Sequence, residues 1–303
     1  MSRQSPAPCA MLEDVLARAG RAATATEYDR AARRTAAVVV DTYSTSFGWA
    51  CRLLGPSVRD HVRAVYALVR VADEIVDDIA ADLTVAQREE LLTGLEEEVA
   101  FAAKRGYSHN LVVHGFVRTA RRYGIGPDLV DPFFASMRTD LSVTRHDDES
   151  FARYVHGSAE VVGLMCLRIF VDGADGAYAR RAAGAARLGA AFQKVNFLRD
   201  LADDVDGRGR SYFPGLDPAA FDDATKDRLL DDIEADLAVA QRAIRDLPRS
   251  SRVAVQLAHD LFAELTRRMR STPAAVLRHQ RVRVPDVVKL RQAARAVSRE
   301  MTR

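Results

Sequence analysis

The segment VRVADEIVDD, residues 69–78, places carboxylates inside a run that otherwise has the pattern of a buried helix. An α-helix advances ~100° per residue, so Tyr66, Arg70, Asp73 and Asp77 fall within an arc of roughly 60°. The neighbouring arc of the same helix is apolar and carries Val65, Leu68, Ala72, Ile75, Val76 and Ile79. The polar stripe therefore borders the face that is expected to be buried instead of lying opposite it.

Taken alone, this pattern is most simply interpreted as a solvated face, because charged pairs four residues apart are common on helices and only weakly stabilising. A second segment, FQKVNFLRDLADDVDGRGRSYFP at 192–214, repeats the arrangement. Its polar residues fall within an arc of about 80° and are Gln193, Asn196, Asp200 and Asp204. Two such stripes predict helices that face a common cavity. Glu74 and Asp78 are predicted to be ordinary surface acids.

Paired carboxylates one helical turn apart suit Mg²⁺, which takes oxygen ligands and is usually held by one or two carboxylates together with substrate phosphates. Ions in that position neutralise a diphosphate leaving group as its carbon–oxygen bond breaks, which generates an allylic cation. Ring faces stabilise such a cation, and the candidates are Phe47, Tyr154 and Phe197. The candidates for binding diphosphate oxygens are Arg70, Arg199 and Arg281.

The rest of the sequence predicts an all-α protein. Only 10 prolines and 17 glycines interrupt 303 residues, and the intervening segments are rich in Ala, Leu and Arg with apolar residues three and four apart. The expected helices cover 27–42, 57–80, 84–104, 108–124, 127–141, 148–170, 175–203, 223–246, 249–270 and 284–300. No segment resembles an interdomain linker, so we expect an N-terminal extension over 1–25 and one helical domain over 26–303.

Composition excludes several other classes of protein. A formal net charge of +2 does not favour nucleic-acid binding. The three cysteines form no CxxC pair and the histidines no HxxxH pair, which argues against a zinc site. Without an apolar run of about 18 residues or a signal peptide, a cytoplasmic protein is expected, at most peripheral to the inner face of a membrane. Contact with anionic lipid or a plain solvated face would each explain the basic residues Arg283, Lys289, Arg291, Arg295, Arg299 and Arg303.

Five segments, in order, carry a resemblance to a known family. They are STSFGWACRLL (44–54), VYALVRVADEIVD (65–77), YVHGSAEVVG (154–163), FQKVNFLRDLADD (192–204) with GRSYFP (209–214), and RVRV (281–284). Together they resemble the squalene/phytoene synthase family of head-to-head prenyltransferases over about Tyr43 to Arg283. The resemblance implies an all-α isoprenoid-synthase bundle around a central active-site cavity, which binds two isoprenyl diphosphates and two or three Mg²⁺ ions.

Matched to the family's motifs, the metal ligands are Asp73, Asp77, Asn196, Asp200 and Asp204. The residues implied to contact diphosphate or line the reaction centre are Tyr66, Arg70, Gln193, Arg199, Tyr212 and Arg281. Those implied to flank the first substrate or the tail pocket are Ser44, Ser46, Phe47, Tyr154 and Gly163. Simpler roles are open for several of them: helix capping for the serines, core packing for the aromatic residues and the glycine, and a solvated surface for Arg281.

The implied activity is condensation of two geranylgeranyl diphosphates, through a cyclopropylcarbinyl diphosphate, to phytoene in carotenoid biosynthesis. NADPH is not expected, since no GxGxxG fingerprint is present. The alternatives are a C30 synthase that makes dehydrosqualene, squalene or hydroxysqualene from farnesyl diphosphate, a diverged terpene cyclase or aromatic prenyltransferase, and a non-catalytic assembly factor. The chain departs from the usual family pattern near the tail pocket, at Trp49, His156, Ser158, Glu160 and Phe262.

Overall fold

The computed structural model describes residues 25–77, 82–207 and 209–301, with the side chains of 45–47 left aside. The described residues form helices and no β-strand, which confirms the all-α prediction. One isolated β-bridge among them pairs Arg145 with Ser211. Most of the predicted N-terminal extension lies outside the described residues, and the domain boundary at residue 26 stays a prediction. No helix in the described ranges is long and apolar enough to cross a bilayer.

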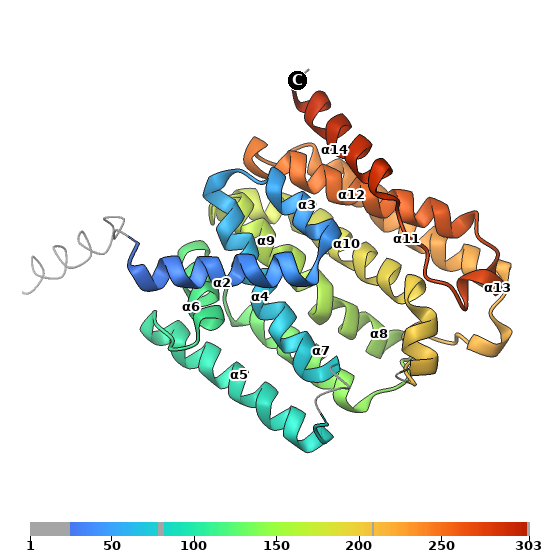
Figure 1. Cartoon of the computed structure of the whole chain (residues 1–303), viewed down its shortest axis with the longest axis horizontal. Helices are drawn as coiled ribbons and strands as arrows, with labels where there is room; N and C mark the ends of the chain where they lie inside the picture. Colours follow the sequence, from blue (N-terminus) through green and yellow to red (C-terminus); the bar gives the residue numbers. More distant parts are fainter. Residues whose placement is uncertain (1–24, 78–81, 208, 302–303) are drawn as a thin grey trace, which may run out of the picture.

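The helices follow one another along the chain with short connections (Figure 1). Their bounds are α2 Glu27–Tyr43, α3 Thr45–Leu53, α4 Pro56–Asp77, α5 Val85–Arg105, α6 Leu111–Tyr123, α7 Pro127–Ser142, α8 Asp148–Val155, the π-helical turn η2 His156–Glu160, α9 Val161–Phe170, α10 Asp175–Arg199, the π-helical turn η3 Asp203–Gly207, the 3₁₀ turn η4 Pro218–Ala220, α11 Asp223–Ile244, α12 Arg249–Arg270, α13 Ala274–Leu277 and α14 Asp286–Met301.

Helices α4, α9 and α10 occupy the middle of the bundle (Figure 1). Helices α2, α5, α6 and α7 pack on one side, where Leu68, Phe116 and Phe133 are fully buried in one hydrophobic cluster. Helices α11 and α12 pack on the other side of α10, where Leu198 and Ile233 belong to a second cluster. The core is therefore divided, and the space between the two clusters is available for a cavity.

Two predicted helices differ from the observed ones, and one observed helix was not predicted. The helix expected over 148–170 is interrupted by η2, and the helix expected over 175–203 ends at Arg199, four residues before η3 begins. Helix α3 was not predicted, although the sequence analysis singled out its residues as a motif. A π-helical turn adds a residue to one turn of a helix, and such turns are frequent at functional sites.

Glycines allow the backbones around η2 to approach closely. A Cβ atom added at Gly189 of α10 would lie 2.4 Å from the carbonyl oxygen of Ala159, and one added at Gly163 of α9 would lie 2.6 Å from that of Ala185. Contacts below 3.0 Å are not tolerated by real Cβ atoms. These positions therefore accept only glycine unless the helices move apart.

We predict that Gly189→Ala lowers the free energy of unfolding by about 1–3 kcal/mol, because the added methyl group must displace backbone. Gly94 of α5 is the matched control, since nothing lies within 4 Å of a Cβ atom added there. Gly94→Ala should raise stability by about 0.5–1 kcal/mol, the usual gain from removing a glycine inside a helix. Urea unfolding followed by circular dichroism measures both, and equal effects of the two changes would contradict this account of the packing.

Candidate active site

A cavity of about 740 Å³ lies between the two halves of the core, bounded by α2, α3, α4, α7, α8, η2, α9, α10, α11 and α12. Every predicted site residue whose side chain is described lines this cavity: Ser44, Tyr66, Arg70, Asp73, Asp77, Tyr154, Gly163, Gln193, Asn196, Arg199, Asp200, Asp204, Tyr212 and Arg281. Ser46 and Phe47 lie in α3, and their side chains are outside the described part of the structure. Residues predicted from five separate segments therefore meet at one place.

The first acidic motif occupies the last two turns of α4, which ends at Asp77. Arg70 Nη1 lies 2.6 Å from Asp73 Oδ2, and the other guanidinium nitrogen of Arg70 pairs with Glu74. The guanidinium carbon of Arg70 also lies 4.5 Å from the ring centre of Tyr43. Glu74, predicted to be an ordinary surface acid, is partly exposed and pairs with Arg70 without lining the cavity; Asp78 lies outside the described residues.

The second acidic motif begins where α10 ends, since Asp200 is the C-cap of that helix. Two arginines hold Asp200: Arg199 Nε is 2.9 Å and Arg281 Nε is 2.8 Å from Asp200 Oδ1. Burial, with the nearby Arg199, lowers the pKa of Arg281. In the structure these two arginines contact a carboxylate, whereas the sequence analysis assigned them to a diphosphate.

Arg210 was not among the predicted residues. Its Nη1 lies 2.6 Å from Asp77 Oδ1, and its Nη2 donates to the carbonyl oxygen of Asp140 at 2.7 Å. The backbone N–H of Ser211 fixes this segment by donating to the carbonyl oxygen of Thr144 at 2.8 Å. Arg210 thus joins the loop after α10 to the end of α4. The segment GRSYFP contained this residue, so the motif that located Tyr212 also pointed to it.

Asp140 is a second residue that the sequence analysis missed. It is 7% exposed, and it accepts hydrogen bonds from the hydroxyls of Tyr154 at 2.8 Å and Tyr212 at 3.3 Å. Burial raises the pKa of Asp140 to about 7, against the opposing effect of Arg210. Its spacing from Phe133 and Met137 places it on the buried face of α7, a signal that was available in the sequence.

Aromatic rings form the wall next to the acidic end. The ring of Phe197 stacks on Tyr212 with 4.0 Å between centroids, and Tyr154 stacks on Tyr212 at 5.3 Å. Further along α10, Phe192 stacks on Phe262 at 3.8 Å, so one of the departures from the family pattern lies in the cavity wall. The surface next to the carboxylates is therefore able to shield and stabilise positive charge.

Beyond these rings the cavity continues as an apolar tunnel along α10. The residues of α10 and its C-cap that line it run from Arg181 to Asp200, a span of ~28 Å at the helical rise. Its far end is bounded by Phe170, Arg181, Ile244 and Leu247. The cavity thus has a charged end and a long hydrocarbon-like end.

The donor set at the charged end fits a hard divalent cation. Asp200 is the C-cap of α10, where the helix dipole adds negative potential. Within the described ranges no three carboxylate, histidine or cysteine side chains are grouped as a complete metal site. Mg²⁺ needs only one or two carboxylates when substrate phosphates and water supply the remaining ligands. Oxygen donors in two pairs suit that arrangement better than a preformed protein cage.

Comparison with known proteins identifies the family. The squalene/phytoene synthase family model matches residues 40–287. The chain belongs to the squalene/phytoene synthase family. It is 28% identical over 246 residues to phytoene synthase from Pseudescherichia vulneris, covering 73% of this chain and 77% of the relative. It is also 28% identical over 302 residues to phytoene synthase from Mycobacterium tuberculosis, covering 91% of this chain and 94% of the relative.

Members of the squalene/phytoene synthase family are prenyltransferases that join isoprenyl diphosphates head to head, and this chain is therefore a prenyltransferase. A solved dehydrosqualene synthase with a bound ligand superposes with a TM-score of 0.78 at 18% identity, covering 91% of this chain and 99% of that one. This similarity confirms the predicted isoprenoid-synthase helical fold. The roles of individual site residues stay predictions.

The raised pKa of Asp140 predicts a pH-dependent stability of the metal-free protein. In the unfolded chain this carboxyl ionises near its ordinary value of 3.8, whereas in the folded chain it holds its proton up to about pH 7. The folded state therefore binds more protons between these limits, and its stability falls as the pH rises from about 4 to about 7.

We expect the free energy of unfolding of the wild type, relative to Asp140→Asn, to fall by a few kcal/mol across that window and to level off above it. Urea unfolding of both proteins at pH 4.5, 6 and 8, without metal, measures the difference. Parallel pH profiles would show that Asp140 ionises normally in the folded protein.

Proposed function

We propose that this prenyltransferase condenses two geranylgeranyl diphosphates, through a cyclopropylcarbinyl diphosphate, to phytoene in a Mg²⁺-dependent reaction. The observation that carries the proposal is the continuous cavity that joins the two acidic motifs to an apolar tunnel along α10. The phytoene synthases among the relatives, at about 28% identity, support the same product.

The length of the tunnel favours a C20 substrate. An extended carbon chain advances roughly 1.2 Å per bond, so each isoprene unit spans about 5 Å and a C20 tail about 20 Å. A diphosphate of about 5 Å brings the total to about 25 Å, which fits the ~28 Å between Asp200 and Arg181. A C15 tail, at about 15 Å, would leave the far third of the tunnel empty.

Mg²⁺ would be held by Asp73 and Asp77 on one side and by Asn196, Asp200 and Asp204 on the other, all of which line the cavity. When bound, the ions neutralise the charge that develops on the departing diphosphate. The pairing of the arginines suits this role, because a guanidinium released from a carboxylate by a cation becomes available for phosphate oxygens. Arg70, Arg199 and Arg281 would then change partners without leaving the site.

The chain's own residues also protect the cationic intermediates. The stacked rings of Phe197 and Tyr212 line the cavity next to the carboxylates, and the hydroxyl of Tyr212 is turned toward Asp140 and Arg210. Water is excluded further along by the Phe192 and Phe262 pair. An apolar wall of this kind favours termination by loss of a proton over capture by water.

The C30 alternatives share the fold, but the tunnel exceeds what a C15 tail requires. A non-catalytic role is disfavoured by charge, because carboxylates and arginines kept inside a cavity cost several kcal/mol unless their mutual pairing or a ligand compensates them. Purified protein incubated with Mg²⁺ and C15 or C20 diphosphate, with and without NADPH, tests the proposal by mass spectrometry of the hydrocarbon. Phytoene from C20 substrate without NADPH is the expected product, and a C30 product or an NADPH requirement would overturn it.

We predict that Asp73→Ala and Asp200→Ala each lower kcat by at least about 10³-fold, because charge stabilisation at the leaving group is lost. Each protein should remain folded, since removing one carboxylate leaves its arginine partner with other acceptors or solvent. Asp131→Ala, an exposed aspartate on α7, is the control and should keep full activity. Turnover of Asp200→Ala at the wild-type rate would exclude this residue from the chemistry.

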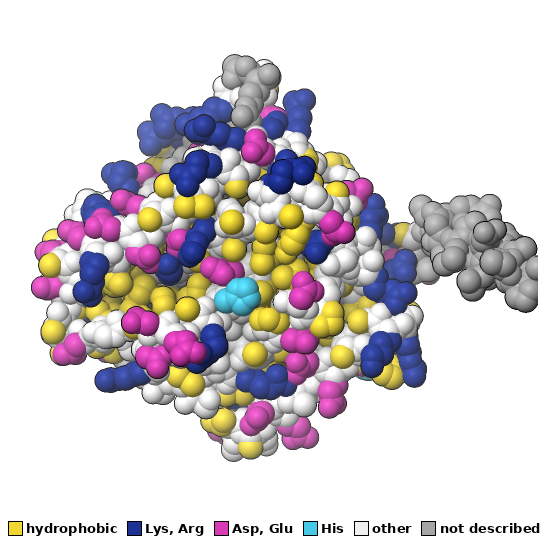
Figure 2. Space-filling view, turned by 180° about the vertical axis from the view of Figure 1, so that it is seen from behind, with side chains coloured by type: hydrophobic (Ala, Val, Ile, Leu, Met, Phe, Trp, Pro, Cys, Tyr) yellow, Lys and Arg dark blue, Asp and Glu magenta, His cyan; other side chains and the backbone are white. Residues whose placement is uncertain are grey.

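We further propose that α14 places the protein on an anionic membrane surface, where a water-insoluble product can leave. At ~100° per residue, its exposed apolar residues fall within an arc of about 80°; they are Val287, Leu290, Ala294, Val297 and Met301. Arg291, Arg295 and Arg299 follow along one flank of this stripe, and Figure 2 shows basic side chains gathered around the end of α14. Lys289, expected on the same face, instead turns inward and pairs with Asp286 at 3.0 Å.

An anionic bilayer matches this surface because it takes both the apolar stripe and the arginines. A second copy of α14 would bring like charges together. The opposite face of α14 packs Ala296 against Leu257 and Leu261 of α12, and Leu261 lines the cavity, so the stripe lies one helix away from the tunnel.

We expect Leu290→Asp combined with Val297→Asp to reduce co-sedimentation with phosphatidylglycerol vesicles at least about tenfold, since each buried aliphatic side chain contributes about 1.5–3 kcal/mol. Val38→Asp, at an exposed valine of α2, should leave sedimentation unchanged. Vesicle binding that persists in the double variant, or absence of binding by the wild type, would remove α14 from this role.

A further inference from the structure

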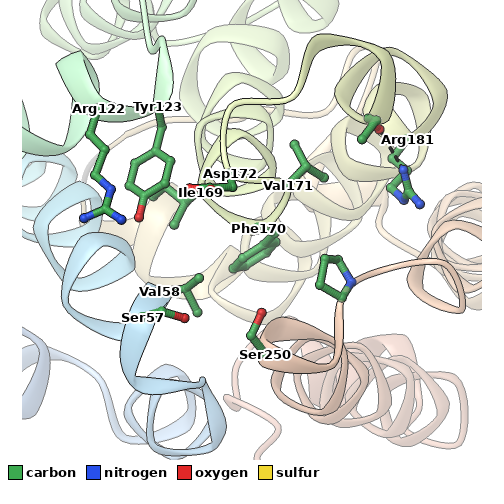
Figure 3. Close-up of a pocket in the computed structure, with 12 residues that line it drawn as sticks. Ser57, Val58, Arg122, Tyr123, Ile169, Phe170, Val171, Asp172, Arg181 and Ser250 are labelled. Carbon is green, nitrogen blue, oxygen red and sulfur yellow. Dashed lines mark hydrogen bonds between the residues drawn. The ribbon is translucent and has the colours of Figure 1, made fainter. Parts of the chain in front are cut away.

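A second pocket, of about 430 Å³, lies behind the far end of the tunnel. It is formed by the start of α4, the end of α6, the end of α9 and the start of α12, and its lining includes Ser57, Arg122, Asp172 and Ser250 (Figure 3). Apolar residues, among them Val58, Ile169 and Val171, complete the lining, so the pocket can accept hydrocarbon as well as polar groups. Nothing in the proposed reaction uses this space.

Two side chains, Phe170 and Arg181, line both the tunnel and this pocket. Phe170 is the last residue of α9, and in Figure 3 its ring lies in the centre of the pocket, with Val58 and Ser250 to one side and Val171 to the other. The ring packs against two separate hydrophobic clusters, the one on the α4 side and the one containing Leu167 and Ile244. Contacts on both sides hold the ring in place between the two spaces.

Arg181, in the second turn of α10, is fixed by the backbone. Its Nε donates to the carbonyl oxygen of Asp246 at 3.0 Å, and its Nη1 donates to that of Ala177 at 2.9 Å. The side chain is thereby held at the end of the tunnel, and two of its three guanidinium nitrogens already donate to backbone oxygens. An isoprenyl chain that reached this point would meet the Arg181 side chain and the Phe170 ring before it could enter the second pocket.

We infer that Phe170, together with Arg181, ends the tunnel and sets the longest isoprenyl chain that the protein accepts, and that the pocket behind Phe170 is the space a longer chain would enter if the ring were removed. The inference rests on the proposed function for the identity of the occupant, an isoprenyl diphosphate. It adds two specificity-determining residues outside the motifs that carry the chemistry.

The dimensions agree with this assignment. A C25 diphosphate is about 30 Å long when extended, which exceeds the ~28 Å along α10, whereas the C20 compound at about 25 Å ends before Arg181. Replacing the phenylalanine ring by a methyl group would connect the tunnel to the second pocket. The gain in length is sufficient for at least one more isoprene unit of about 5 Å.

The test compares C15, C20 and C25 diphosphates with wild type, Phe170→Ala and Val171→Ala. Val171 lines the second pocket but not the tunnel. Its truncation therefore enlarges the pocket and leaves in place the Phe170 ring that separates the pocket from the tunnel. For the wild type and Val171→Ala we expect kcat/KM to favour C20 over C25 by at least about tenfold. For Phe170→Ala the two substrates should differ by less than about threefold.

Binding of the unreactive thiolodiphosphate analogues, followed by thermal shift, gives the same comparison without turnover, and Phe170→Leu provides a milder change if the alanine variant is unstable. An unchanged C20 to C25 ratio in both variants overturns the inference, as does an equal change in Val171→Ala. If the wild type turns over none of the diphosphates, the proposed function fails. If the wild type is active and the C20 to C25 ratio is the same in Phe170→Ala, only the role of Phe170 at the end of the tunnel fails.

Discussion

The structure depends on the ion pairs that compensate the negative charge of the two acidic motifs. Helix α4 delivers Asp73 and Asp77 to one cavity, and the C-cap of α10 with the π-helical turn η3 delivers Asp200 and Asp204. Gathering that much like charge in one partly enclosed cavity is unfavourable unless cations compensate it. Arg70, Arg199, Arg210 and Arg281 contact three of the four aspartates, and they come from four different parts of the chain.

This requirement explains features that packing alone does not. Arg210 reaches Asp77 only because the loop after α10 folds back along the segment between α7 and α8, where Ser211 pairs with Thr144. The same loop carries Tyr212 into the stack with Phe197 and into contact with Asp140. The electrostatic and aromatic parts of the site are thus positioned together by one short segment.

The sequence was sufficient for the helical class and for the residues that meet in the cavity, because helix periodicity places Asp73 above Asp77 without any tertiary information. It did not predict the π-helical turn η2, since that turn depends on the close approach of Gly157 to the backbone of Pro132, 2.1 Å from an added Cβ atom. It also missed the pairs of Arg210 with Asp77 and of Arg281 with Asp200, because partners brought from remote segments are set by the fold. Asp140 was detectable by its spacing, but a buried acid among apolar residues has no motif of its own.

The pairing of each contacted aspartate with its own arginine has a consequence for how such a site changes over time. Loss of an arginine leaves its aspartate beside the other carboxylates without that cation, so such a substitution changes the electrostatics of the acidic motifs as well as the chemistry. The effect should be smaller at Asp200, because Arg199 and Arg281 both contact it and either arginine alone still compensates its charge. Drift in this family should therefore begin at shared partners, and residues such as Arg210 and Asp77 should be replaced together or not at all.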